Sequence, residues 1–69
     1  MRFGYTVKVG PEDLGRRVTV RSRTPDGRLS DTVGVLEECD DTTFGVRDKR
    51  GNLVRIERAL VVAAKVIPQ

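Results

Sequence analysis

The chain has 69 residues, of which 38% are apolar, and this length allows a single domain with a small hydrophobic core. One cysteine and no histidine exclude an internal disulfide, a zinc finger, a Ser-His-Asp triad and any histidine-ligated metal. The 13 Lys and Arg residues against 10 Asp and Glu residues give a net charge of +3, which permits a nucleic-acid partner without requiring one. We therefore expect no catalysis by this chain alone.

Signals for membranes or secretion are missing from the sequence pattern. No apolar run approaches the roughly 18 residues of a membrane span. The first residues lead into alternating side chains rather than into the apolar segment of a signal peptide. We expect a cytoplasmic protein with no membrane contact.

Apolar and polar residues alternate along the first part of the chain, as they do in half-buried β-strands. Residues 3–9 predict a first strand or an extended N-terminal arm. After a turn at residues 12–15, residues 16–23 predict the clearest strand, in which Val18 and Val20 face inward. The residues that alternate with them then face outward, namely Arg17, Thr19, Arg21 and Arg23.

A glycine interrupts the next predicted strand. Residues 24–27, Thr-Pro-Asp-Gly, have strong turn chemistry, and residues 29–38 resume the extended pattern with Gly34 near its centre. Glycine inside a strand marks a bulge, a bend or a close backbone approach. We expect a bend at Gly34 of the kind that closes a small barrel and leaves few exposed edges.

The last part of the chain predicts three more strands. Residues 43–49 and 53–57 form a hairpin, and residues 62–67 form a final strand because Val is frequent and Pro68 favours extended backbone before it. One turn of 3₁₀ helix is expected at Arg58–Leu60. The sequence therefore predicts an all-β fold, a small antiparallel barrel of five or six short strands.

Four segments carry a family resemblance. They are Asp-Leu-Gly-Arg-Arg-Val-Thr-Val-Arg at 13–21, Pro-Asp-Gly at 25–27, Asp-Thr-Val-Gly-Val-Leu at 31–36, and Arg-Ile-Glu-Arg-Ala-Leu-Val-Val-Ala-Ala-Lys-Val-Ile-Pro at 55–68. Together they resemble the SH3-like barrel domain that precedes the catalytic domain in a group of actinobacterial GNAT-type N-acetyltransferases, often described as histone-acetyltransferase-like. The pattern departs from that domain at Leu14 and Glu57, where a smaller apolar residue and a proline are expected.

The resemblance implies a non-catalytic accessory domain at residues 12–69, preceded by an arm or first strand at residues 1–11. It implies docking to an adjacent catalytic domain or recognition of a substrate protein. Acetyl-coenzyme A would bind only in a following GNAT domain, through a Gly-rich loop that opens a helix. The seven glycines here are scattered singly, so no cofactor-binding or catalytic residue is carried over. The alternative is a stand-alone nucleic-acid-binding small barrel of the Sm-like or SH3-like type.

Arginines on and beside the clearest strand form the candidate contact surface. They are Arg16, Arg17, Arg21, Arg23 and Arg28. They could contact phosphates or an acidic protein surface. The alternative is an ordinary solvated strand face whose arginines pair with nearby acids such as Asp26 and Asp31.

Acidic residues crowd one predicted turn, but their spacing lacks the pattern of a calcium loop. They are Glu37, Glu38, Asp40 and Asp41. We therefore expect no metal there. Cys39 lies among these acids, and like charge should disfavour its thiolate, so we expect a half-buried strand residue rather than a nucleophile.

Two further features suggest contacts. Strict alternation would aim Asp48 inward, where Arg55 or Arg50 could pair with it, unless it is simply exposed near the hairpin end. Residues 61–67 are apolar on both faces. One face of this strand is expected to lie under the N-terminal arm or to meet another surface, including a second copy of the chain.

Overall fold

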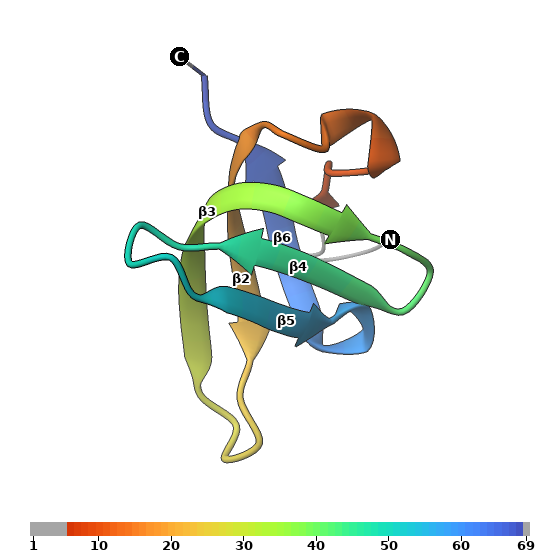
Figure 1. Cartoon of the computed structure of the whole chain (residues 1–69). Helices are drawn as coiled ribbons and strands as arrows, with labels where there is room; N and C mark the ends of the chain where they lie inside the picture. The colour runs from red at the N-terminus through yellow and green to blue at the C-terminus, as the bar shows by residue number, and fades with distance from the viewer. Residues whose placement is uncertain (1–5, 69) are drawn as a thin grey trace.

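The computed structural model describes residues 6–68 and confirms an all-β fold with two short 3₁₀ helices (Figure 1). The elements are β1 (Thr6–Val7), η1 (Pro11–Asp13), β2 (Arg17–Arg23), β3 (Leu29–Cys39), β4 (Thr43–Arg47), β5 (Leu53–Glu57), η2 (Arg58–Leu60) and β6 (Val61–Val66). The predicted 3₁₀ turn at Arg58–Leu60 is confirmed. Residues 3–5 of the expected first strand lie outside the described residues.

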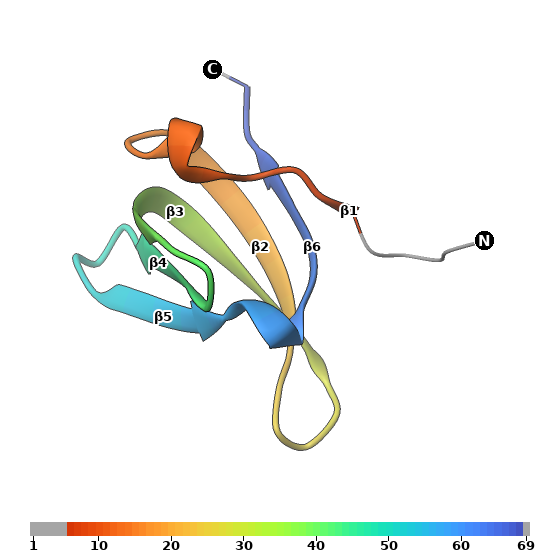
Figure 2. The ribbon, with the colours of Figure 1, turned by 90° about the vertical axis from the view of Figure 1, so that its right-hand side faces the viewer.

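One six-stranded sheet contains all the strands in the order β1-β6-β2-β3-β4-β5. The pairs from β6 through β5 are antiparallel, as the sequence predicts. The pair of β1 and β6 is parallel, with Thr6 opposite Ala63 and Val7 opposite Ala64, which corrects the expectation of a wholly antiparallel barrel. Strand β6 lies between β1 and β2 (Figure 2). Because β1 and β2 run in opposite directions, β6 can be antiparallel to only one of them, and that strand is β2.

The core lies on the inner face of the bent sheet. Val18 and Val20 are fully buried, as their alternation in β2 predicts, and they pack with Phe44 from β4. The remaining buried apolar side chains are Val9, Leu36, Val46, Ile56, Val61 and Ala64. Val9 comes from the segment that follows β1, so this segment contributes to the core as well as to the sheet.

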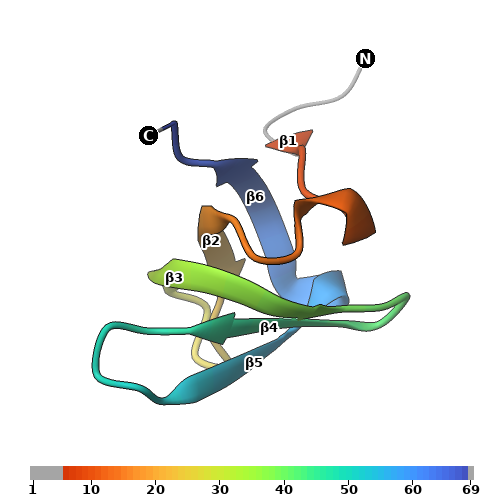
Figure 3. The ribbon, with the colours of Figure 1, turned by 45° about the horizontal axis from the view of Figure 1, so that its top comes forward.

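Strand β3 curves across the molecule (Figures 1 and 3), and Gly34 lies one residue before the point where its pairing passes from β2 to β4. It pairs with β2 from Leu29 to Val35 and with β4 from Val35 onward. A Cβ atom at Gly34 would overlap the carbonyl oxygen of Arg47 and lie 2.8 Å from its carbonyl carbon. Of the features that the sequence allowed at Gly34, a close backbone approach is therefore confirmed, and it is made by the carbonyl group of Arg47 at the end of β4.

Closure of the sheet is incomplete within residues 6–68. Strands β1 and β5 end the strand order and do not pair with each other. The sheet is thus strongly bent but keeps two edge strands, whereas the sequence suggested that closure would remove most edges. The short β1 limits one of these edges to two paired residues.

Candidate binding groove

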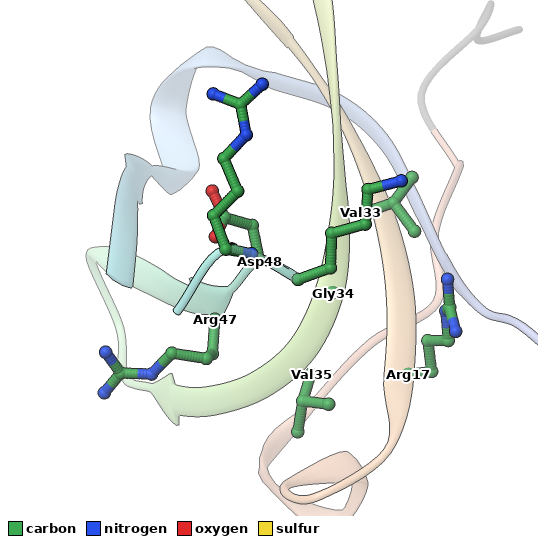
Figure 4. Close-up of a pocket in the computed structure, with 8 residues that line it drawn as sticks. Arg17, Val33, Gly34, Val35, Arg47 and Asp48 are labelled. Carbon is green, nitrogen blue, oxygen red and sulfur yellow. Dashed lines mark hydrogen bonds between the residues drawn. The ribbon is translucent and has the colours of Figure 1, made fainter. Parts of the chain in front are cut away.

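A groove of about 490 Å³ opens on the outer face of the sheet, between β3 and the loop that joins β4 to β5. We call it the basic groove. Its lining residues are Arg17, Val33, Gly34, Val35, Arg47, Asp48, Lys49 and Arg50 (Figure 4). They include four cationic side chains and one carboxylate.

The floor of the basic groove is aliphatic. Val33 and Val35 flank Gly34 in β3, and because strand side chains alternate they point outward while Gly34 faces inward. These valines are 43% and 38% exposed, which is high for β-branched side chains in a central strand. In the register, Thr19 lies opposite Val33 and Arg17 opposite Val35, so the floor continues onto β2.

Arg47 forms one wall and is held by internal partners. Its guanidinium donates to both carboxylate oxygens of Glu37, from Nε to Oε2 at 3.2 Å and from Nη2 to Oε1 at 2.8 Å. Its Nη1 donates to the carbonyl oxygen of Gly51 at 2.9 Å. The hydrogen bonds from Arg47 hold the pKa of Glu37 below its ordinary value. In Figure 4 the Arg47 guanidinium points away from Arg17.

Asp48 organises the loop of the groove. Its Oδ1 accepts the backbone N–H groups of Arg50 and Asn52, each at 2.9 Å, and the bond from Asn52 is the main reason that the pKa of Asp48 is lowered. Neither pairing considered for Asp48 forms: Arg55 binds Glu38 at 3.0 Å, and within residues 6–68 no ion pair joins Asp48 to Arg50. The physical reason is that β4 ends at Arg47, so strand alternation no longer fixes the direction of the Asp48 side chain.

Three cations of the basic groove have no carboxylate within 4.0 Å in the described part of the chain. They are Arg17, Lys49 and Arg50. Arg17 comes from β2, whereas Lys49 and Arg50 come from the loop that Asp48 holds. The groove therefore combines an aliphatic floor with positive charge on two opposite sides, an arrangement suited to an anionic ligand that also carries apolar groups.

The five predicted contact arginines are not brought together in one site. Arg17, Arg21 and Arg23 share the outer face of β2, Arg16 precedes that strand, and Arg28 lies in the loop before β3. Arg21 donates to both oxygens of Asp31, at 2.8 and 3.1 Å, and Arg28 lies 3.6 Å from Asp26. These are the pairings that the alternative interpretation expected. Of the five, Arg17 lines the basic groove.

The crowded acids each have a structural partner or a place on the surface. Glu37 binds Arg47, Glu38 binds Arg55, and Asp40 accepts the N–H groups of Thr42 and Thr43. Within residues 6–68 no three Asp, Glu or Cys side chains gather in a way that could hold a metal ion.

Cys39 ends β3 as a half-buried residue, which confirms the sequence prediction. Burial is the main cause that raises the pKa of its thiol. The negative charge of Asp40 raises the pKa further, and the positive charge of Arg58 opposes both effects. The thiol is therefore kept in its neutral, weakly nucleophilic form at neutral pH.

Sequence reasoning missed the loop cations and the two outward valines as parts of one site. Lys49 and Arg50 lie 14 to 17 positions beyond Val33 and Val35 in the chain, so no local pattern joins them. The residue that pointed to this site is Gly34, because its missing side chain lets the carbonyl group of Arg47, at the end of β4, approach the middle of β3. An outward Val-Gly-Val run beside a predicted bend is the feature that could have located the groove.

Comparison with protein families identifies the fold group. The model of the family described as the Rv0428c N-terminal Sm-like domain matches residues 12–65. The chain belongs to this family. The match confirms the small Sm-like or SH3-like barrel inferred from the sequence. Comparison with curated proteins and comparison with solved structures gave no match.

The basic groove lies within the matched part of this Sm-like domain, since all its lining residues fall between positions 12 and 65. Because a fold does not by itself determine a function, the function must be argued from the sites on the surface of this chain. None of the helical segments in residues 6–68 has the length and apolar character needed to cross a membrane.

Proposed function

We propose that this Sm-like domain is a non-catalytic binding module that docks a protein partner in the basic groove. The observation that carries the proposal is a set of three cations that have no ion pair within residues 6–68, Arg17, Lys49 and Arg50, around an exposed aliphatic floor. Other arginines of the sheet are paired across strands, as Arg21 is with Asp31 and Arg55 with Glu38. Arg23 also has no carboxylate within 4.0 Å in residues 6–68, so what distinguishes the groove is that three such cations gather around one aliphatic floor.

The partner that we propose is an adjoining GNAT-type acetyltransferase domain or the protein substrate of such a domain. Two observations support this context: the resemblance of residues 12–68 to a domain that precedes acetyltransferase domains, and a family description that names an N-terminal domain. Acetyl-coenzyme A would then bind the catalytic domain and not this chain. The working compartment in this proposal is the bacterial cytoplasm.

The decisive experiment begins with the coding sequence after Gln69. If it continues into a βα pattern with a Gly-rich helix start, that region is produced separately and titrated with this chain by calorimetry. We expect binding that Arg17→Glu and Arg50→Glu weaken by about tenfold or more, because each reversal places a carboxylate in the groove. Arg23→Glu, on the same strand but outside the groove, is the matched control. A stop codon directly after Gln69 would overturn the acetyltransferase context.

A second candidate function is binding of single-stranded nucleic acid, and one observation favours it. A smaller groove of about 370 Å³ crosses β2 beside the basic groove, and its lining includes Lys8, Lys65 and the ion pair of Arg21 with Asp31. Thr19 of β2 pairs with Lys65 on one side and with Val33 on the other, so the two grooves adjoin across this strand. Together they form a cationic band across the outer face.

Salt dependence tests this second candidate. We would titrate the chain with an eight-nucleotide uridine strand and with duplex DNA at about 50 mM and about 300 mM NaCl. Phosphate-driven binding should be strongest at the lower concentration and fall steeply at the higher one. No binding at low salt would remove nucleic acid as a ligand.

A further inference from the structure

Part of β3 has a strand on one side only. Strand β3 pairs with β2 from Leu29 to Val35, but its pairing with β4 begins at Val35. Within residues 6–68, no strand pairs with residues 29–34 on the side that faces away from β2. This free edge begins where the sheet bends at Gly34, and its Val33 end lies in the basic groove.

The hydrogen-bond register shows which backbone groups point to the free edge. The N–H of Leu36 donates to the carbonyl oxygen of Arg16 at 2.9 Å, and the N–H of Thr24 donates to that of Arg28 at 2.8 Å. In an antiparallel pair the bonded positions alternate, so the even-numbered residues of this part of β3 face β2. The N–H and C=O groups of Val33 therefore point away from β2, into the edge that no strand occupies.

In the part of the chain that the structure describes, an unpaired edge, an aliphatic floor and cations without carboxylate partners thus coincide at one place. We propose that an extended acidic peptide segment adds to β3 in the basic groove, with backbone hydrogen bonds to Val33. Its aliphatic side chain packs on Val33 and Val35, and its carboxylates face Arg17, Lys49 and Arg50. The proposal rests on the proposed docking function and names the chemical class of its partner. Strand addition supplies affinity through the main chain, and the groove supplies side-chain selectivity.

A peptide fits the groove better than a nucleic-acid strand does. Single-strand nucleic-acid sites combine cations with aromatic platforms on which bases stack. The basic groove has valines in that place, and Phe44 is fully buried with the Arg58 guanidinium 4.7 Å from its ring centre. Guanidinium groups bind carboxylates in two-point contacts, and extended aliphatic side chains match a valine floor.

The test uses a synthetic peptide, acetyl-Asp-Glu-Val-Ile-Glu-Asp-amide. Six extended residues span about 20 Å, the length of the free edge, and either face of this peptide presents a carboxylate, an aliphatic side chain and a carboxylate. We expect its titration into isotope-labelled protein to shift the amide signals of Val33, Val35, Lys49 and Arg50 in a saturable way. Saturable shifts confined to another surface would overturn the groove assignment.

Two modified peptides separate strand addition from simple charge attraction. The Asn/Gln version of the peptide removes the carboxylates, and we expect it to bind about tenfold more weakly. A version N-methylated at alternate backbone nitrogens keeps every charge but cannot donate along one edge, and we expect a loss of about fivefold or more. If the N-methylated peptide binds as tightly as the parent, strand addition is wrong.

Protein variants complete the test. Arg17→Ala and Arg50→Ala should each weaken peptide binding several-fold, whereas Arg23→Ala on the same strand should leave it unchanged. Amide spectra of each variant verify that the fold is retained. If the peptide does not bind the groove, the peptide inference fails, whether or not the uridine strand binds. The docking function is decided separately, by titration of the region encoded after Gln69, so the two proposals can fail independently.

Discussion

Gly34 illustrates how one residue without a side chain determines the shape of this sheet. A Cβ atom there would overlap the carbonyl oxygen of Arg47, which is backbone and cannot swing aside. We expect Gly34→Ala to lower the free energy of unfolding by about 1–3 kcal/mol, the usual cost of forcing extra volume into a packed site. Urea denaturation at neutral pH measures the change.

Gly10→Ala is the matched control for this prediction. A Cβ atom at Gly10 would meet the carboxylate of Glu12, at 2.7 Å from its Oε1, and this carboxylate is the free end of a flexible side chain. Its backbone is extended, with φ −141°, so alanine fits the conformation. The control should change stability by much less than Gly34→Ala. Equal losses at both sites would show that the contact with Arg47 is not the cause.

The ion pair between Glu37 and Arg47 predicts a pH dependence. Hydrogen bonds from Arg47 lower the pKa of Glu37 in the folded chain, and the unfolded chain has the ordinary value of about 4.3. The stabilisation is therefore present above that value and is lost as the pH falls through the lowered native pKa. We expect the urea midpoint to fall as the pH decreases below about 4.

Carboxyl titration by NMR assigns this effect to the pair. In Arg47→Ala the pKa of Glu37 should return toward its ordinary value, because its hydrogen-bond donor is gone. Glu38 should keep a lowered pKa in the same variant, since Arg55 is its main partner. A Glu37 that titrates at the ordinary value in the unmodified chain would contradict the prediction.

The loop between β4 and β5 acts as a unit because one carboxylate holds it. Asp48→Ala removes the acceptor for the N–H groups of Arg50 and Asn52, while Asp48→Asn keeps an acceptor oxygen. We expect the amides of Arg50 and Asn52 to exchange with solvent about tenfold faster in the alanine variant, and near the normal rate in the asparagine variant. Hydrogen-exchange NMR gives both rates.

Groove binding by the acidic peptide adds a second measurement on this loop. Removing a carboxylate from a basic groove would strengthen the binding of an acidic ligand if charge alone mattered. If the loop must be ordered to present Lys49 and Arg50, Asp48→Ala should instead weaken binding several-fold. The direction of the change thus shows whether loop order or net charge dominates.

Local alternation was sufficient to predict the strands and most of the core. Val18 and Val20 were placed inward because a half-buried strand has a period of two, and both are fully buried. Strand ends differ by one or two positions, most clearly where residues 43–49 were expected and β4 ends at Arg47. At that point the hydrogen bonds to the Asp48 side chain replace the backbone hydrogen bonds between strands, and the alternation of apolar and polar residues does not predict them.

The candidate site was predicted less well than the fold. Arg17 was among the expected contact residues, but Lys49 and Arg50 reach the same groove only through the bend and the pairing of β3 with β4. Which arginines remain free depends on cross-strand partners such as Asp31, and one sequence does not give their register. The pairing of strands that are far apart in the sequence therefore limited how much of the candidate site the sequence could predict.

At the scale of the whole molecule, the segment around β1 protects the last strand. The N–H of Lys8 donates to the carbonyl oxygen of Ala64 at 2.8 Å, and Val9 is buried in the core. The sequence suggested that the N-terminal arm covers a face of residues 61–67, whereas β1 pairs with the edge of β6 within the sheet. Self-association through residues 61–67 stays a prediction, and β1 occupies the edge that a second copy would use.

Lys8→Pro tests this protection because proline has no N–H to donate. We expect a loss of about 1 kcal/mol in the free energy of unfolding and greater self-association, since the edge of β6 becomes available. Lys8→Ala, which keeps the backbone N–H, is the control. Sedimentation at several concentrations measures the association. A Lys8→Pro variant with the same mass distribution as the Lys8→Ala variant would contradict the prediction.

The position of β6 also constrains the order of folding. The last strand to be synthesised lies between β1 and β2, two of the first. Strands β2 to β5 can pair as neighbours while the chain is still being made, but β1 has no partner until Ala63 and Ala64 have left the ribosome. Any segment encoded after residue 68 would therefore emerge while the sheet is still being completed, and a chain broken off before β6 would lack the strand that links its beginning to the rest.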